Sequence, residues 1–221
     1  MRINPDSNLR TYAAEVGARK FEVPSVTTVL RVVGRDYLNS WKNRVGEKEA
    51  DRTMRDAQSF GTRLHAAAHD VALGKKIVVM DDLRPHVEAV EKFFALHVDE
   101  VVVAEKSLAS ARLGFGGTLD LLCRTTDGQM AVVDFKTTRQ LTKTVGHQLA
   151  AYAMLAREHD YVIHRRIGVR VKKEKPGEFH ARSYTDHRGD VRVFRACLEL
   201  WWAMDAQKKS PLPEWVPGEV A

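Results

Sequence analysis

Residues 117–138, GTLDLLCRTTDGQMAVVDFKTT, decide the fold because they hold two short apolar runs joined by a turn. The second run, at 131–133, is typical of a strand that enters a core, yet it ends in Asp134 and Lys136. Side chains alternate between the two faces of a strand, so these two residues project from the same face. An acid and an amine placed in this way form either a surface ion pair or part of a functional site.

The turn between the two runs determines which acids share a face. Its Asp-Gly pair is a strong hairpin signal, and it allows two registers. A two-residue turn would pair Leu121 with Asp134 and send Asp120 to the opposite face. A three-residue loop over 126–128, with Gly128 in the left-handed conformation, would pair Asp120 with Asp134. We favour the longer loop, partly because two carboxylates on one face repel each other unless a cation lies between them. Magnesium prefers one or two carboxylates, so the pair and the nearby lysine predict a metal site beside an amine.

Composition limits the class of protein. The chain has 221 residues, 44% hydrophobic and 29% charged, which fits one globular domain with a core. Its formal net charge of +6 favours a polyanionic partner without proving one. The two cysteines, Cys123 and Cys197, are too few for an iron–sulfur cluster, which needs about four ligands. They do not indicate a disulfide framework either.

The N-terminal sequence and the hydropathy predict where the protein resides. The first residues lack the apolar core of a signal peptide, and they carry Asp6 and Glu15, which a transit peptide would avoid. No apolar run approaches the ~20 residues of a membrane span. We therefore expect a cytoplasmic protein without a membrane partner.

The periodicity predicts helices first, then a sheet, then helices. A helix is expected after Ser25 as N-cap, with helical character up to residue 49. The other expected elements are helices over 59–74 and 81–98, strands over 100–110, 115–125 and 129–137, a helix over 144–158, strands over 165–173 and 178–185, and a helix over 190–208. The proline-broken tail, 210–221, is expected to lie on the surface.

The expected architecture is an α/β fold with a small mixed central β-sheet flanked by helices. We expect a single domain over 1–221. Its expected parts are a mainly helical N-terminal part (1–99), the sheet with one motif helix (100–185), and a C-terminal helix and tail (186–221).

Several motifs, in their order along the chain, resemble those of the PD-(D/E)XK nucleases. The first is GTLD, which ends at Asp120, and the second is DFK at 134–136. The sequence QLAAY then places Gln148 and Tyr152 four residues apart, on one helix face. Upstream, GTRLH supplies His65 on a helix. This set resembles most closely the RecB-type exonuclease branch, which includes phage-encoded exonucleases and the mitochondrial genome maintenance exonuclease.

The resemblance covers roughly residues 24–155 and departs from the family pattern at three points. Leu119 stands where the family name has proline, and the second acid is Asp134, which the name allows. The chain also lacks the four-cysteine iron–sulfur staple of several relatives, so it resembles the members without a cluster. The resemblance implies a restriction-endonuclease-like core in a cytoplasmic protein, bacterial or phage-encoded.

The resemblance also implies a role for each motif residue. One or two Mg²⁺ or Mn²⁺ ions are expected, with no iron–sulfur cluster. The implied metal ligands are His65, Glu105, Asp120, Asp134 and the Phe135 carbonyl. Lys136 would orient the attacking water or stabilise developing charge. Gln148 and Tyr152 would orient Lys136 or contact DNA. The alternatives are an ordinary helix histidine at position 65 and purely structural hydrogen bonds for Gln148 and Tyr152.

The predicted function is that of a metal-dependent DNA exonuclease, acting on single-stranded DNA or DNA ends in replication, recombination or repair. The predicted DNA contacts are Ser25, Thr27, Arg139, Lys143, Arg166, Arg170 and Lys172. Helix capping alone is the alternative for Ser25, and simple solvation is the alternative for the basic strand face at 166–172. Two other functions stay open, namely an endonuclease with the same catalytic face and a non-catalytic DNA-binding recombination partner.

Overall fold

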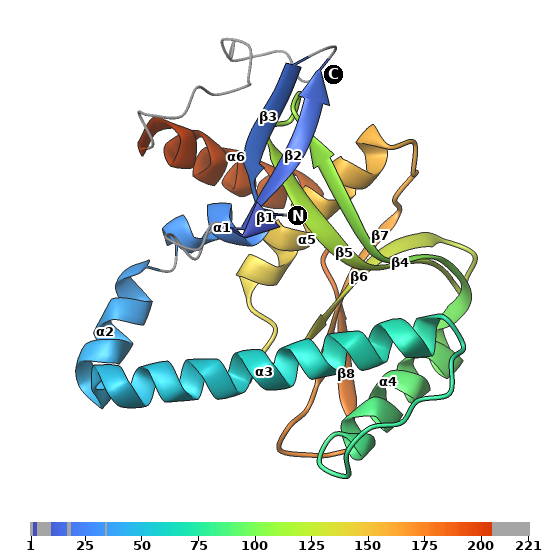
Figure 1. Cartoon of the computed structure of the whole chain (residues 1–221). Coiled ribbons are helices and arrows are strands. Elements are labelled where there is room, and N and C mark those ends of the chain that lie inside the picture. The colour runs from blue at the N-terminus through green and yellow to red at the C-terminus, as the bar shows by residue number, and fades with distance from the viewer. Residues whose placement is uncertain (1, 4–9, 17–18, 34, 205–221) are drawn as a thin grey trace.

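The computed structural model describes residues 2–3, 10–16, 19–33 and 35–204 (Figure 1). Its first sheet has the strands β1 (Arg2–Ile3), β2 (Arg10–Val16) and β3 (Arg19–Pro24). Its second sheet has β4 (Val98–Ser110), β5 (Phe115–Thr125), β6 (Met130–Lys136), β7 (Arg165–Val171) and β8 (Phe179–Ser183). The helices are α1 (Val26–Leu30), the 3₁₀ turn η1 (Arg31–Val33), α2 (Arg35–Val45), α3 (Glu47–Ala72), α4 (Arg84–His97), α5 (Lys143–Glu158) and α6 (His187–Met204).

The second sheet is mixed and has the order β4-β5-β6-β7-β8. All neighbouring strands in it are antiparallel except β6 and β7, which are parallel. Parallel neighbours need a crossover connection, and α5 provides it. Helices cover the sheet on both faces, so the predicted α/β fold with a small mixed sheet is confirmed.

Two hydrophobic cores lie on the two faces of this sheet. Leu122 and Val132 belong to the core that includes residues of α1, α5 and α6. Their chain neighbours Leu121 and Val133 belong to the core that includes residues of α3 and α4. Because both faces are covered, the central strands are apolar at nearly every position instead of alternating. Figure 1 shows α3 and α4 on one side of the sheet and α5 and α6 on the other.

The β5–β6 hairpin has the longer of the two loops considered for it. Leu121 pairs with Val133, and the backbone N–H of Thr125 donates to the carbonyl of Gln129 at 2.9 Å. Gly128, inside the loop that this bond closes, has φ 79°, in the left-handed region. The predicted three-residue loop and register are therefore confirmed. The next pair in this register is Asp120 and Asp134, so the two acids lie across from each other.

The N-terminal part is mainly helical, as expected, but it also contains the sheet β1–β3, which the sequence did not predict. The helix α3 begins at Glu47, well before the expected start. Its first half has mostly exposed side chains, and Figure 1 shows it extending past the sheet. The helix α6 begins at His187 instead of Asp190. The expected surface tail lies outside the described residues. Among the described helices, none combines the length and the apolar character that a membrane crossing requires.

Candidate active site

Two strand acids meet at the end of the β5–β6 hairpin. Asp120 lies across from Asp134, one pair beyond the Leu121–Val133 pair of the ladder. The carboxylate oxygen Oδ2 of Asp120 accepts a 2.8 Å hydrogen bond from the backbone N–H of Phe135. Asp134 is almost fully buried, with 1% of its side chain exposed, whereas the side chain of Asp120 retains 16% exposure. The hairpin register thus brings a buried acid and a partly accessible acid together.

Lys136 compensates the charge of Asp134. Its Nζ lies 2.6 Å from Asp134 Oδ2, at ion-pair distance, although that buried oxygen makes no hydrogen bond with the described residues. Burial raises the pKa of Asp134 to about 6, with a further rise from the Asp120 charge, while Lys136 opposes the shift. Loss of hydration therefore outweighs the attraction of the ammonium group.

The helix α5 supplies a second contact to the same acid. Gln148 Nε2 donates to Asp134 Oδ1 at 2.9 Å and to the Tyr152 hydroxyl at 2.9 Å. Gln148 and Tyr152 are both buried and stand one helical turn apart. Burial raises the pKa of the Tyr152 phenol well above its ordinary value, so this hydroxyl stays protonated. Gln148 contacts the acid, whereas the sequence predicted that it orients Lys136 or touches DNA.

His65 reaches this site from α3. Its Nδ1 lies 3.2 Å from Asp120 Oδ2, and its side chain is 30% exposed. Burial lowers the pKa of His65, but attraction to Asp120 and a hydrogen bond with it raise the pKa more, so the net shift is upward. One turn earlier, Gly61 of α3 lies next to Thr137, just after the end of β6. Residues far apart in sequence therefore converge on one point.

Glu105 lies beside Asp120 on the neighbouring strand β4. The pairs Ala104–Leu121 and Lys106–Leu119 flank it, which places it across from Asp120. Its side chain is exposed, and its backbone has φ 48°, in the left-handed region. A non-glycine residue held there costs about 1–3 kcal/mol, and such residues are frequent at functional sites. Its predicted role toward a second metal ion stays a prediction.

Comparison with known proteins identifies the family. A sequence model of the PD-(D/E)XK nuclease superfamily matches residues 83–214, more than half of the chain. The chain belongs to the PD-(D/E)XK nuclease superfamily. The matched segment contains both strand acids, Lys136, Gln148 and Tyr152, whereas His65 lies upstream of it. Membership indicates a nuclease with a nucleic acid substrate, and nucleases of this superfamily generally use divalent metal ions such as Mg²⁺.

The remaining comparisons add little. A solved structure titled "Crystal structure of SSO0001" has a TM-score of 0.40 and 14% sequence identity, over 89% of this chain and 86% of that chain. Similarity at that level adds nothing to the argument. The comparison with curated proteins found no match.

The donor atoms of this nuclease suit a hard divalent cation, but they are not arranged around one. Among the described residues, no three histidine, cysteine, aspartate or glutamate side chains form a group that could hold a metal ion as they stand. Each acid instead has a basic neighbour, His65 for Asp120 and Lys136 for Asp134. Carboxylate and carbonyl oxygens with one imidazole suit Mg²⁺ or Mn²⁺, and the buried Asp134 Oδ2 has the ion pair with Lys136 but no hydrogen bond to the residues that the structure describes. The residues therefore fit such an ion once Lys136 leaves Asp134.

Four predicted DNA contacts lie in or near the first turn of a helix or in a loop. Ser25 is 2% exposed, and its hydroxyl accepts a 3.0 Å hydrogen bond from the backbone N–H of Thr28 as the N-cap of α1. The Ser25 side chain thus has a structural role. Thr27, the other residue predicted to contact DNA in this segment, is exposed. Arg139 and Lys143 are exposed just after β6 and in the first turn of α5. Their contact with DNA stays a prediction.

The basic strand face predicted on β7 does not exist as such. Arg166 is 5% exposed and forms a 2.7 Å ion pair with Asp190, so the prediction of a DNA contact there is corrected. The strand lies between β6 and β8 with helices on both faces, which is why this arginine is buried. Arg170 contacts Glu174, and Lys172 contacts Glu178 at 2.7 Å. Any DNA contact by these two residues would have to compete with the glutamates.

One chain of polar contacts next to the site was not predictable from the sequence. The hydroxyl of Tyr12, on β2, lies 3.0 Å from Thr118 Oγ1, which in turn lies 2.8 Å from Ser107 Oγ. Thr118 is two residues before Asp120, so the N-terminal sheet reaches the edge of the site. No motif in the sequence indicates this, because Tyr12 belongs to the sheet that was not predicted.

Gly117 makes room for Tyr152, and this gives a testable prediction. A Cβ at position 117 would lie 2.6 Å from Tyr152 Cε1 and 3.3 Å from Val26 Cγ2. We expect Gly117→Ala to lower the free energy of unfolding by about 1–3 kcal/mol through overpacking, as measured by urea denaturation. Gly61→Ala is the matched control, because its Cβ would meet Thr137 Oγ1 at 3.6 Å, an ordinary contact. In a helix interior that change should be neutral or stabilising by up to ~1 kcal/mol. Equal stability of both variants would contradict the prediction.

Proposed function

We propose that this protein is a metal-dependent DNA exonuclease. One observation carries the proposal: the two strand acids, Lys136, Gln148 and His65 come from β5, β6, α5 and α3 and meet at one point. Chance similarity of short motifs would not produce this convergence. A non-catalytic DNA-binding protein would have no need for a buried acid beside a lysine and a second acid, because such a group is electrostatically costly.

Each side chain has a role that its position supports. A divalent cation held by Asp120, Asp134, the Phe135 carbonyl and His65, with Glu105 beside a second ion, would supply Lewis-acid chemistry at the scissile phosphate. Lys136, displaced from Asp134, would place its ammonium group next to the attacked phosphate and orient the water. Gln148 would hold Asp134 in the orientation that the ion requires, with its second N–H fixed by the Tyr152 hydroxyl.

The preference for single-stranded DNA or DNA ends has a weaker basis. This preference is supported by the resemblance to the RecB-type branch. The net charge of +6 suits single-stranded and double-stranded DNA equally. The same resemblance supports a role in replication, recombination or repair, and a cytoplasmic location. An endonuclease with the same catalytic face is the alternative.

Digestion of end-labelled DNA tests the proposal directly. Single-stranded and double-stranded substrates would be incubated with Mg²⁺, Mn²⁺ or EDTA, and a circular single strand would be included. We expect metal-dependent release of short products from linear DNA, with the circle left intact. Cleavage of the circle would favour the endonuclease, and absence of cleavage under all conditions would contradict a nuclease.

Binding of DNA should depend strongly on salt. A protein that neutralises phosphates releases counterions, so log affinity should fall with log salt at a slope of about −0.7 per phosphate contact on a single strand. Measurements by fluorescence anisotropy in Ca²⁺, with an uncleaved oligonucleotide, would give this slope. Replacing the exposed Arg139 and Lys143 together should reduce its magnitude by roughly 1.4 units if both contact phosphates. A flat salt dependence in the unmodified protein would mean that the basic side chains do not bind the backbone.

A further inference from the structure

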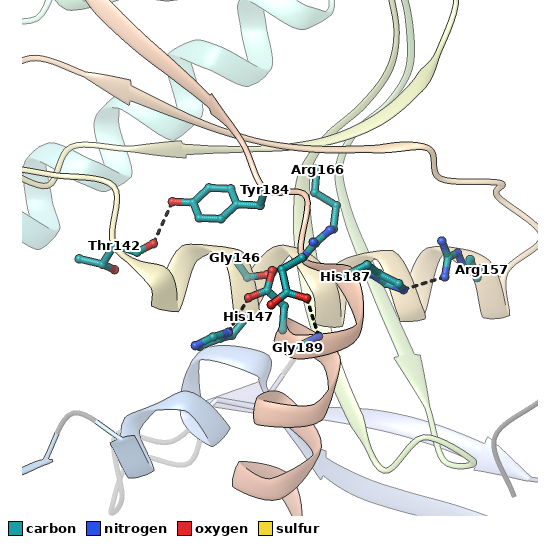
Figure 2. Close-up of polar contacts among 10 residues, drawn as sticks. Thr142, Gly146, His147, Arg157, Arg166, Tyr184, His187 and Gly189 are labelled. Atoms are coloured by element: carbon teal, nitrogen blue, oxygen red, sulfur yellow. Dashed lines mark hydrogen bonds and ion pairs between the residues drawn. The ribbon is translucent and has the colours of Figure 1, made fainter.

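A second buried polar cluster joins β7, α5 and α6. Asp190 Oδ2 accepts a 2.7 Å hydrogen bond from Arg166 Nη1, and Asp190 Oδ1 lies 2.9 Å from His147 Nδ1. The same Arg166 nitrogen donates to the Gly146 carbonyl at 3.1 Å. The exposed fractions of the Arg166 and Asp190 side chains are only 5% and 12%. Figure 2 shows Arg166 reaching from the sheet toward Gly146 and His147 on α5.

Close backbone contacts surround this cluster. A Cβ at Gly146 would lie 2.6 Å from Tyr184 Cδ1 and 3.0 Å from Asp190 Oδ2. The Tyr184 hydroxyl donates to the carbonyl of Thr142, the N-cap of α5, at 2.8 Å (Figure 2). A Cβ at Gly168, on β7, would lie 3.0 Å from Val145 Cγ1. The first turns of α5 therefore lie against β7 and Tyr184 without room for an additional carbon.

The cluster stands next to the candidate active site. In the parallel β6–β7 pair, Arg166 lies beside Val132, and Gly168 lies beside Asp134. The residue after His147 on α5 is Gln148, which donates to Asp134 at 2.9 Å. The cluster thus holds α5 against the sheet close to both partners of this hydrogen bond. His147 is one residue from Gln148, and Arg166 lies beside Val132, two residues from Asp134. Apolar packing is not directional, so it does not by itself fix the position of α5 along its axis as these hydrogen bonds do.

We propose that Arg166, Asp190 and His147 are positioning residues, which fix the first two turns of α5 on the sheet so that Gln148 meets Asp134. This inference rests on the proposed nuclease function. It extends the catalytic machinery to α6, a helix that carries none of the motif residues. It also gives the buried Arg166 a role that does not involve contact with DNA.

A double-mutant cycle tests whether the cluster acts through Gln148. We expect Asp190→Asn to lower kcat for DNA cleavage by about 10–100-fold, because a displacement near 1 Å at a catalytic group costs up to that factor. The KM should stay within about twofold, since the cluster does not touch DNA. In a Gln148→Ala background, Asp190→Asn should lower kcat no further, because residues that act through one contact are not additive. Unchanged kcat in the single variant, or a multiplied loss in the double variant, would overturn the inference.

A matched control separates positioning from general stability. Arg157 Nη1, in the last turn of α5, lies 3.0 Å from His187 Nε2 on α6, so Arg157→Gln removes a contact between the same two helices at the opposite end of α5 from Gly146 (Figure 2). Its kcat should match the unmodified protein. If Asp190→Asn fails to fold, the double replacement Arg166→Met with Asp190→Leu removes both buried charges and keeps side-chain volume. This double variant should fold, and its kcat should fall by the same factor as that expected for Asp190→Asn.

A measurement without DNA separates this inference from the proposed function. The side-chain amide of Gln148 gives an NMR signal in ¹⁵N-labelled protein, which Gln148→Ala identifies by its loss. Asp190→Asn should move this signal toward the position of a free amide, whereas Arg157→Gln should not. A signal that stays in place would overturn the inference even in a protein without nuclease activity. A shifted signal in a protein that cleaves no DNA would contradict the proposed function only.

Discussion

Lys136→Ala is expected to reduce DNA cleavage at least ~100-fold while DNA binding and the fold persist. Removal of one group that stabilises charge in the transition state costs about 10²–10³ in rate. Lys136 is the last residue of β6, and without its ammonium group the buried Asp134, whose pKa is already raised, can take up a proton, so the fold should persist. Single-turnover cleavage in Mg²⁺ with saturating enzyme measures the chemical step directly.

Two control variants sharpen this prediction. Lys136→Met keeps the volume of the side chain and removes only the charge, so its rate should be as low as that of Lys136→Ala. Lys173→Ala removes a lysine on the loop after β7. Its Nζ lies 4.1 Å from the centroid of the Phe60 ring, and among the described residues it forms no ion pair with either acid. Its cleavage rate should stay near that of the unmodified protein. A purified Lys136→Ala protein with full activity would remove the central catalytic claim.

The fold of the central sheet was predictable because its signals are local. The apolar runs between residues 98 and 136 are short and bounded by turns, and the spacing of the α5 motif is helical. The Asp-Gly turn allowed two registers, and the choice between them followed from the expectation that a cation lies between two acids on one face. Both arguments need only the residues within one hairpin, and the structure agrees with them.

What could not be predicted depends on partners distant in sequence. Arg166 alternates with apolar residues like an exposed strand residue, and its burial is tolerable because it pairs with Asp190, 24 residues later, and donates to the Gly146 carbonyl. The sheet β1–β3 was missed because the burial of Tyr12 depends on partners far along the chain, such as Gly116 of β5. The sequence predicted that His65 and Lys136 lie near the two acids, but it did not predict the ion pairs of His65 with Asp120 and of Lys136 with Asp134.

Asp134→Asn is expected to abolish cleavage and yet to stabilise the metal-free protein above pH 6. Loss of activity follows because the amide removes a charged ligand from the proposed metal site. The stability change follows from the raised pKa of Asp134, about 6 in the folded protein against an ordinary value of 3.8. The folded protein thus holds the proton more tightly than the unfolded chain, so stability falls as the pH rises from about 4 through about 6. An asparagine has no such slope.

The size and the sign of the effect can both be checked. A pKa difference of about 2 corresponds to about 3 kcal/mol, so we expect Asp134→Asn to be more stable than the unmodified protein by roughly 1–3 kcal/mol at pH 8 in EDTA. The gain should vanish below about pH 3, under both the ordinary and the folded pKa, because Asp134 is then neutral in the folded and in the unfolded protein. Gln148 Nε2 can still donate to the asparagine oxygen, so the packing around α5 should persist. Urea denaturation at the two pH values gives the difference in unfolding free energy.

Addition of metal should reverse the order of stability. A ligand that binds only the folded state stabilises it by about 2.7 kcal/mol at 100 times its Kd, so Mn²⁺ should stabilise the unmodified protein and not Asp134→Asn. The same acid would then explain both results, since a carboxylate that is costly when buried without an ion becomes favourable when it binds one. A variant less stable than the unmodified protein at pH 8 in EDTA would contradict this. An equal response of both proteins to Mn²⁺ would mean that the ion binds elsewhere.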